Sequence, residues 1–241
     1  MVKAVLFDLD DTLLGNSMDT FLPAYFGALT RWLEHLVPPE RLIGELGRAT
    51  QAMNAPRHTE LTNEEAFASV FYRALDADRS RLESAIERFY AEEFPKLRKL
   101  TRKRPEARSL VGWALEEGLQ VAVATNPLFP RVAVEERLAW AGVPADEIDY
   151  ALVTTYENMH ATKAHHAYYY EILTRLGRRA DECLMVGDSW EMDVVPASSV
   201  GIHVYWVSGS VKLTSAEVRL AGCGSLRDLW HVVETQGSFP I

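Results

Sequence analysis

The sequence predicts an α/β fold in which a doubly wound, Rossmann-like parallel sheet carries an inserted all-helical part. Helical patterns alternate with short apolar segments, as a doubly wound sheet requires. The apolar segments have the length and composition of strands that are buried on both faces. They are residues 4–7, 119–124, 150–154, 183–186 and 202–207. In such a sheet we expect the active site at the carboxyl ends of the strands.

Two helices of the predicted core have clear signals at their ends. Pro105 opens an apolar helical pattern, and Gly118 suits the C-cap of that helix. A second pattern runs over 166–176 and ends similarly at Gly177. Both helices fit the alternation of strands and helices in a doubly wound sheet.

The stretch between the first strand and Pro105 breaks this alternation, because it contains four amphipathic helical patterns and no convincing strand. Prolines precede the second helix, and Thr62 with Glu65 and Ser80 with Glu83 have capping-box spacing at the starts of the other two. We therefore predict two domains. An α/β core comprises residues 1–16 and 97–241, with a helical insertion at 17–96. The basic exit segment 98–104 is expected to be a solvated linker.

Composition excludes several classes of protein. The chain has 241 residues, of which 48% are hydrophobic, so it can bury a sizeable core. A formal net charge of −9 makes nucleic acid an unlikely partner. Two cysteines are too few for a disulfide framework, and no apolar run approaches the ~20 residues of a membrane span. We expect a cytoplasmic protein without a membrane-inserted part.

The segment Asp8–Thr12 is the strongest chemical signal. Asp8 and Asp10 follow the first strand, and residues two apart at a strand end tend to point the same way. One carboxylate could attack a substrate while the other moves protons. A calcium-binding loop is the alternative, but a strand precedes Asp8 and Leu13 stands where that loop needs glycine.

Polar residues also follow the second and third predicted strands. Thr125 and Asn126 come after the second, where a hydroxyl and backbone amides can bind a phosphoryl oxygen, although such residues are also common in turns. Lys163 follows the third strand and would supply a cation, although a single lysine is more often solvated. His165 and His166 are adjacent on a helix and cannot share one ligand site.

The fourth strand leads into a glycine turn and more acids. Asp188 could join Asp8 around Mg²⁺, a cation that takes one or two carboxylates together with waters and phosphate oxygens. Asp188 or Ser189 could instead cap the following helix. The two roles are compatible, because a helix start near a phosphate is itself favourable.

Taken together, these segments resemble the haloacid dehalogenase superfamily. Its signature is Asp-x-Asp-x-Thr, then Ser or Thr, then Lys, then Gly-Asp with a further Asp. The matching residues here are Asp8, Asp10, Thr12, Thr125, Lys163, Gly187, Asp188 and Asp193. The resemblance spans the core, and it implies that the insertion is a cap. Asp11 and Ala164 depart from the residues common at their positions, Gly and Pro.

The resemblance implies a phosphatase in which each matching residue has a defined role. Asp8 would be the nucleophile and Asp10 the proton donor and then the base. Thr12 would belong to the phosphate site, and Thr125, Asn126 and Lys163 would hold the phosphoryl oxygens. Mg²⁺ would be held by Asp8, the backbone carbonyl of Asp10 and Asp188, with Asp193 ordering a metal-bound water or Lys163. The substrate would be a small phosphorylated metabolite that the sequence does not name.

Other functions remain open at this point. Dehalogenases of the family lack the second acid, so Asp10 favours a phosphatase. A phosphomutase would keep every core residue named. A non-enzymatic phosphoacceptor is disfavoured, because receiver domains are shorter and phosphorylate an Asp on a later strand. A silent binding protein is disfavoured too, since no reacting position is missing.

Several residues could touch the substrate's organic part. Asn16 lies near the predicted hinge, and Arg57 and His58 lie in a loop of the cap. Phe129 and Trp190 border the second and fourth motifs and could line the entrance. The oligomeric state is not specified by the sequence.

Overall fold

The computed structural model describes residues 1–55, 60–75, 78–208, 218 and 220–241. Its core is a six-stranded sheet in the order β5-β4-β1-β6-β7-β8, and all paired neighbours run parallel. The strands are β1 (Ala4–Phe7), β4 (Gln120–Val123), β5 (Leu152–Val153), β6 (Cys183–Gly187), β7 (His203–Val207) and β8 (Leu220–Gly224). The predicted α/β class and all five predicted strands are confirmed.

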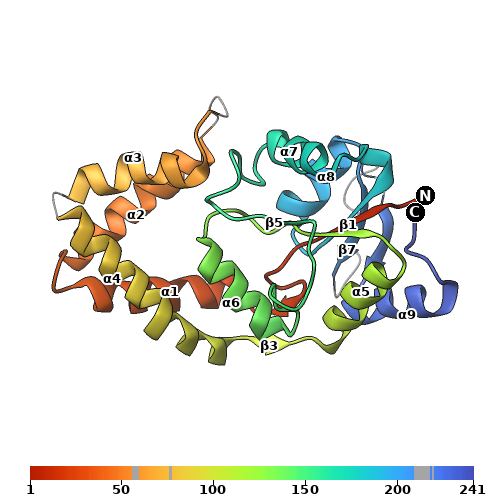
Figure 1. Ribbon diagram of the computed structural model, residues 1–241, viewed down its shortest axis with the longest axis horizontal. Coiled ribbons are helices and arrows are strands. Elements are labelled where there is room, and N and C mark those ends of the chain that lie inside the picture. Colours follow the sequence, from red (N-terminus) through yellow and green to blue (C-terminus); the bar gives the residue numbers. More distant parts are fainter. Residues whose placement is uncertain (56–59, 76–77, 209–217, 219) are drawn as a thin grey trace.

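Helices cover both faces of the sheet (Figure 1). Alternate side chains of β1 are buried on opposite faces of the sheet, since Val5 and Phe7 belong to one apolar cluster and Ala4 and Leu6 belong to another. The first cluster holds α5 (Pro105–Glu116), α6 (Arg131–Ala141) and α9 (Leu226–Gln236), and the second holds α7 (His166–Leu176) and α8 (Val195–Ser199). Strands buried on both faces account for the continuous apolar runs in the sequence.

The sixth strand, β8, was not predicted from the sequence. Its residues are Leu-Ala-Gly-Cys-Gly, and two glycines in five residues give little strand propensity. Gly222 is required by packing, because a Cβ there would lie 2.9 Å from the ring of Tyr205 on β7. Packing between β7 and β8 therefore requires glycine at position 222, and glycine lowers the strand propensity that would have indicated β8 in the sequence.

The four predicted helices of the insertion are confirmed as α1 (Met18–Leu33), α2 (Pro39–Asn54), α3 (Asn63–Leu75) and α4 (Arg79–Glu92). We call them the helical part, and it lies beside the sheet (Figure 1). The capping box of Thr62 and Glu65 is present. The proposed cap Ser80 is wrong, because the Asp78 carboxylate accepts from the backbone N–H groups of Ser80 and Arg81, and α4 therefore starts two residues earlier.

The exit segment is more ordered than a solvated linker. Residues Phe94–Leu100 form a 3₁₀ helix (η1), and β3 (Arg102–Lys103) pairs antiparallel with β2 (Leu14–Gly15). The chain therefore leaves and re-enters the core through one short ladder. Apolar packing is also continuous across this connection, since the rings of Phe94 and Trp140 stack with centroids 5.4 Å apart.

No helix in the part of the chain that the structure describes is both long enough and apolar enough to cross a bilayer. Two short helical turns, η2 (Ala180–Glu182) and the π-helical η3 (Trp190–Val194), flank β6. The second of these turns carries Asp193 into the site described next.

Candidate active site

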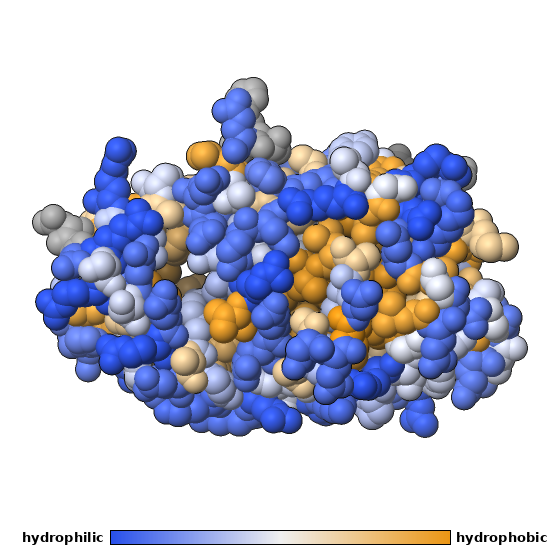
Figure 2. Space-filling model, in the orientation of Figure 1, coloured by the Kyte–Doolittle hydropathy of each residue, from blue (hydrophilic) through white to orange (hydrophobic). Residues whose placement is uncertain are grey.

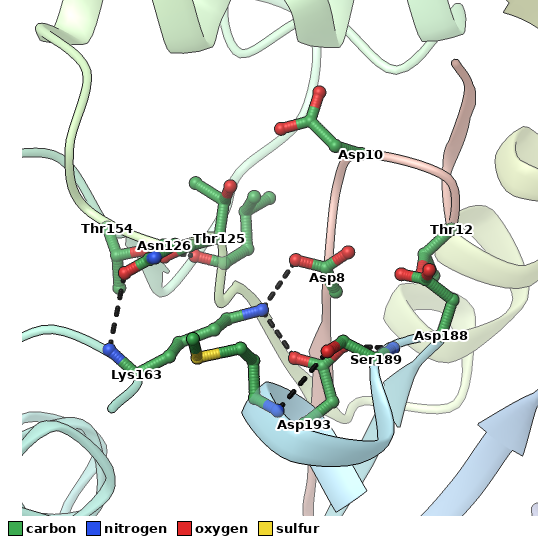
Figure 3. A network of polar contacts seen from close by, with 12 residues as sticks. Asp8, Asp10, Thr12, Thr125, Asn126, Thr154, Lys163, Asp188, Ser189 and Asp193 are labelled. Carbon is green, nitrogen blue, oxygen red and sulfur yellow. Dashed lines mark hydrogen bonds and ion pairs between the residues drawn. The ribbon is translucent and has the colours of Figure 1, made fainter. Parts of the chain in front are cut away.

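Three carboxylates meet at the carboxyl ends of β1 and β6. Asp8 follows β1, Asp188 follows β6, and Asp193 lies on η3 (Figure 3). One carboxylate oxygen of each lies within 4.8 Å of the others. The strands are adjacent and parallel, so their ends deliver these side chains to one edge of the sheet. The sequence prediction that Asp8 and Asp188 come together is confirmed.

Lys163 is the cation of this cluster. Its Nζ donates to Asp8 Oδ1 and to Asp193 Oδ1, both at 2.5 Å, and its side chain is almost completely buried. Three carboxylates face one ammonium group, which leaves an excess of negative charge in a partly desolvated place. Such a place favours either a bound cation or protonated carboxyls.

The pKa directions reflect this excess of negative charge. Burial raises the pKa of Asp8 well above its usual range, with Lys163 opposing the shift and Asp193 and Asp188 adding to it. Burial, with smaller contributions from Asp193 and Asp11, raises the pKa of Asp188 to about 6. Burial alone would lower the pKa of Lys163, but the carboxylates of Asp193 and Asp8 outweigh it and raise that pKa.

Asp193 is fixed by a turn that only glycine permits. A Cβ at position 187 would lie 2.4 Å from the Asp193 carboxylate, so Gly187 makes room for that side chain. The other carboxylate oxygen, Oδ2, accepts from the backbone N–H of Ser189 at 3.0 Å. Asp193 therefore holds Lys163 in place, in line with the expectation that it orders this lysine.

The residues after β4 form the opposite wall. Thr125 is buried and Asn126 accepts a hydrogen bond from the backbone N–H of Lys163 at 3.3 Å. The carbonyl of Thr125 accepts from the hydroxyls of Thr154 and Tyr168, both at 2.8 Å. These two hydroxyl groups were not anticipated from the sequence, because their partner is a backbone atom that no side-chain pattern reveals.

A pocket of about 450 Å³ opens over these groups. Nearly all of the predicted site residues line it, namely Asp8, Asp10, Thr125, Asn126, Lys163, Asp188 and Asp193. Thr12, expected at the phosphate site, is fully buried, and its hydroxyl donates to Asp188 Oδ1 at 3.3 Å. Thr12 therefore contacts a carboxylate of the cluster.

Asp10 lines the pocket, but its carboxylate lies outside the group of three. Asn16 Nδ2 donates to Asp10 Oδ1 at 2.9 Å, and Arg137 Nη1 donates to Asp10 Oδ2 at 2.5 Å. Figure 3 shows the Asp10 side chain directed away from Asp8. Residues two apart do not share a direction here, because β1 ends at Phe7 and a turn begins at Leu9, whose carbonyl accepts from the backbone N–H groups of Thr12 and Leu14. The same turn holds Asp11 at a φ of 55°.

The turn at Asp11 is held by charge and by a side-chain amide. Arg104 Nη2 lies 2.6 Å from Asp11 Oδ1, and Asn16 Oδ1 accepts from the Asp11 backbone N–H at 3.1 Å. Asn16, one of the candidates for contact with the substrate, thus spans the turn from Asp10 to Asp11. Arg104 belongs to the segment predicted as a solvated linker, so that prediction is wrong for this residue.

Arg137, the buried partner of Asp10, is a residue beside the candidate site that the sequence analysis missed. It is fully buried on α6, where its Nε donates to the carbonyl of Ala133 and its guanidinium lies 4.4 Å from the ring centroid of Phe129. The available signal was its position on the apolar face of a helix, beside Val134 and Leu138. A buried arginine needs a partner, and that partner is Asp10.

Replacing Arg137 should therefore destabilise the fold. For Arg137→Met we expect the free energy of unfolding to fall by about 3 kcal/mol, because one partner of a buried ion pair is removed. Urea unfolding at pH 7 measures this. Arg131→Met is the matched control on the same helix, since Arg131 is half-exposed and pairs with Glu135 at 3.3 Å. The control should change stability by less than about 0.5 kcal/mol, and equal losses in the two variants would contradict a structural ion pair.

A second prediction concerns Asp188 in metal-free protein. A carboxyl whose pKa is raised by folding prefers its neutral form there, so its ionisation costs stability. This cost is absent below the ordinary pKa of about 4 and complete above about pH 6. Asp188→Asn removes it, so the variant should gain on the order of 1–2 kcal/mol over wild type at pH 7 and almost nothing at pH 4.

Urea unfolding in the presence of a chelator at both pH values measures that gain. Asp146→Asn is the control, because Asp146 is exposed. A variant that is less stable than wild type at pH 7 would show that the carboxylate is stabilised by its surroundings instead.

Other predicted residues have different places. Phe129 lines the pocket, whereas Trp190 packs against Trp206 with centroids 4.9 Å apart. The rings of His165 and His166 contact different partners, the carbonyl of Asn54 and the hydroxyl of Ser199 respectively. The prediction that these adjacent histidines do not share one ligand site is in line with these contacts. Arg57 and His58 lie outside the described residues.

The donor set suits a hard divalent cation. Asp8, Asp188 and Asp193 offer only carboxylate oxygens, which Mg²⁺ and similar ions prefer. Their close approach is costly without positive charge, and Lys163 supplies only one charge for three carboxylates. The residues present therefore fit a divalent metal, bound beside the buried Asp8.

Comparisons with known proteins identify relatives of this chain. A family model described as haloacid dehalogenase-like hydrolase matches residues 2–201. A phosphoglycolate phosphatase from Rhodospirillum rubrum is 31% identical over 210 residues, which are 86% of this chain and 80% of the relative.

Two solved structures share the fold. One is a 2-haloacid dehalogenase from Pseudomonas syringae pv. Tomato DC3000, with a TM-score of 0.65, 23% identity and coverage of 98% of this chain and 100% of the other. The other is a phosphatase from Thermococcus onnurineus, with a TM-score of 0.58, 23% identity and complete coverage of both chains. At these identities the likeness concerns the fold alone.

Proposed function

The chain belongs to the haloacid dehalogenase-like hydrolases, and we propose that it is a phosphatase that hydrolyses phosphate monoesters with Asp8 as the nucleophile. The observation that carries the proposal is the meeting of Asp8, Asp188 and Asp193 with Lys163 in one pocket. A phosphoryl group brings negative charge, and its transfer depends on positioning and on neutralising that charge. A carboxylate nucleophile beside a cation-attracting cluster meets both needs.

The proposed reaction has two steps. An Asp8 carboxylate oxygen attacks phosphorus, the ester P–O bond breaks, and the departing alkoxide takes a proton from Asp10. Water then attacks the phosphorus of the aspartyl phosphate and gives a proton to Asp10. The bond between phosphorus and the Asp8 oxygen breaks, so orthophosphate is released and the Asp8 carboxylate is restored.

The remaining residues would bind and orient the phosphoryl group. Lys163 is already aimed at the nucleophile, and Thr125 and Asn126 form the wall that faces it. We propose Mg²⁺ as the cofactor, held by Asp8, Asp188 and the backbone carbonyl of Asp10, with Asp193 acting through Lys163. When bound, this ion would neutralise charge on the phosphoryl oxygens.

Asp10 also argues for a phosphatase over a dehalogenase. Proton transfer to an alkoxide and from water needs a second acid, and Asp10 lines the pocket with ordered partners.

We further propose that the helical part, predicted as 17–96, acts as a cap over the core 1–16 and 97–241. The free cysteines Cys183 and Cys223 suit the reducing cytoplasm that we propose as its compartment.

Hydrolysis of p-nitrophenyl phosphate tests the proposal. We expect turnover with Mg²⁺, loss of turnover with excess chelator, and recovery when Mg²⁺ is restored. Phosphoglycolate is included because a relative bears its name. Phosphate released without an acceptor indicates hydrolysis, whereas transfer to an added sugar phosphate would indicate a phosphomutase. No phosphate release from any ester would refute the proposed function.

A further inference from the structure

We propose that an apolar cavity beside the active site receives the organic group of the substrate, so that the natural substrate is the phosphate monoester of a lipophilic alcohol or phenol. This inference rests on the proposed phosphatase function and deepens it. The cavity measures about 330 Å³ and lies where the helical part meets the loop after β4. In Figure 2 the surface is hollowed between the helical part and the core.

The cavity and the active-site pocket share a boundary. Leu22 on α1, and Leu128 and Phe129 after β4, line both of them. An ester whose phosphoryl group lies at Asp8 therefore has apolar side chains next to its leaving group. The same three residues separate a charged end of the site from an uncharged one.

The lining of the cavity offers little to a polar ligand. Its walls carry aromatic and aliphatic side chains from all four helices, such as Phe26, Leu46, Phe67, Phe71 and Ile86. Apolar surfaces of this kind release water at little cost. They bind apolar groups because binding removes apolar surface area from water and adds contacts with aromatic rings.

Three of the five hydroxyl groups along the described wall already have partners within the protein. The hydroxyls of Tyr25 and Tyr90 lie 2.9 Å apart, and the hydroxyl of Thr50 donates to the carbonyl of Leu46 at 2.8 Å. Burial raises the pKa of Tyr25 and of Tyr90, so both remain neutral at physiological pH. The hydroxyls of Tyr72 and Tyr156 are the ones left for a ligand in the described wall, so a sugar would lose more hydrogen bonds to water than these two groups replace.

Charge in this region disfavours an acid substrate. No lysine or arginine is among the described residues that line the cavity. Arg137 lies behind the wall, against the ring of Phe129, and is paired with Asp10. A carboxylate in the cavity would therefore be desolvated without a cation, which is costly.

The size of the cavity suits a substantial group. A dry cavity of ~150 Å³ lined by apolar side chains accommodates benzene. The space beside this site is about twice as large, which suits a bicyclic ring or a chain of several methylenes. Its walls also present aromatic rings in edge-to-face pairs, such as Tyr25 and Phe129 at 5.2 Å.

A series of alkyl phosphates tests the inference without changing the chemistry of the leaving group. We expect kcat/KM to rise by about threefold for each added methylene from ethyl to hexyl phosphate. Phosphoglycolate should be a poorer substrate than ethyl phosphate, because its carboxylate has no cation in the described wall. A kcat/KM that does not change with chain length, or that is highest for phosphoglycolate, would overturn the inference.

Two glycines of α2 provide matched variants. A Cβ at Gly44 or at Gly47 would meet nothing within 4 Å, and both residues are exposed, but only Gly47 lines the cavity. Gly47→Leu should reduce the ratio of kcat/KM for hexyl over ethyl phosphate by about tenfold, by occupying the space. Gly44→Leu should leave the ratio unchanged. Equal ratios in both variants would overturn the inference.

The two proposals fail in different ways. If no ester, including p-nitrophenyl phosphate, is hydrolysed with Mg²⁺, the phosphatase function is refuted. If short and long esters are hydrolysed equally well, the phosphatase stands and the apolar substrate class is refuted.

Discussion

Asp8→Asn should lower kcat/KM for p-nitrophenyl phosphate by at least about 10³-fold, since an amide is a poor nucleophile and no other carboxylate takes its place. Asp8 is buried in the pocket and bonded to Lys163, while Asp10 is held aside by Arg137. The neighbouring acids Asp188 and Asp193 are occupied by Thr12 and by Lys163 with Ser189. Steady-state kinetics at pH 7 with saturating Mg²⁺ measures the loss.

The fold of this variant should survive. Burial raises the pKa of Asp8, so the ionised carboxylate strains the metal-free protein and asparagine relieves that strain. We expect urea unfolding in the presence of a chelator to show no loss of stability. Asp146→Asn, at an exposed site, is the activity control. Activity within tenfold of wild type in Asp8→Asn would rule out Asp8 as the nucleophile.

The site was predictable where it depends on strand ends. Asp8, Thr125 and Asp188 each follow a short apolar run, and parallel neighbours place such residues at one edge. The sheet was predictable for the same reason, because strands buried on both faces leave an apolar signal. Lys163 could be assigned only through the resemblance of the whole pattern, since a single lysine after a strand has no distinctive spacing.

Features that depend on contacts distant in sequence were not predictable. The carboxylate of Asp10 is oriented by Arg137, which is 127 residues away along the chain. The alternation of side chains that suggested a shared direction for Asp8 and Asp10 ends with β1 at Phe7, because the backbone turns from Leu9 onward. The apolar cavity likewise needs the packing of the helical part against the loop after β4. Apart from Phe129, its lining residues had no feature in the sequence that distinguished them from ordinary core positions.

The charge balance of the site connects its function to its stability. Three carboxylates and one lysine are unfavourable together unless a cation or a proton joins them. The same excess of negative charge gives the site its affinity for a divalent ion and costs the metal-free protein stability. Lys163 is the one positive group among these four side chains, so its removal should increase the excess of negative charge.

Lys163→Met should cost about 3 kcal/mol of unfolding free energy in metal-free protein at pH 7, because Asp8 and Asp193 lose their shared partner inside the fold. The deficit should shrink as the pH falls, since Asp8 and Asp188, whose pKa values are raised, become neutral and no longer add to the negative charge. Activity should also fall, by about 10²-fold or more, because a donor aimed at the phosphoryl site is lost. Urea unfolding and steady-state kinetics measure the two effects.

A double-mutant cycle separates the ion pair from simple loss of packing. Asp193→Asn in the Lys163→Met background removes one of the stranded carboxylates, so the double variant should be more stable than Lys163→Met alone by about 1 kcal/mol. Lys96→Met is the surface control, since the side chains of Lys96 and Glu93 are 63% and 29% exposed, and it should change stability by less than about 1 kcal/mol. If the second substitution lowers stability further, Lys163 serves mainly as packing, and the charge balance proposed for the site is wrong.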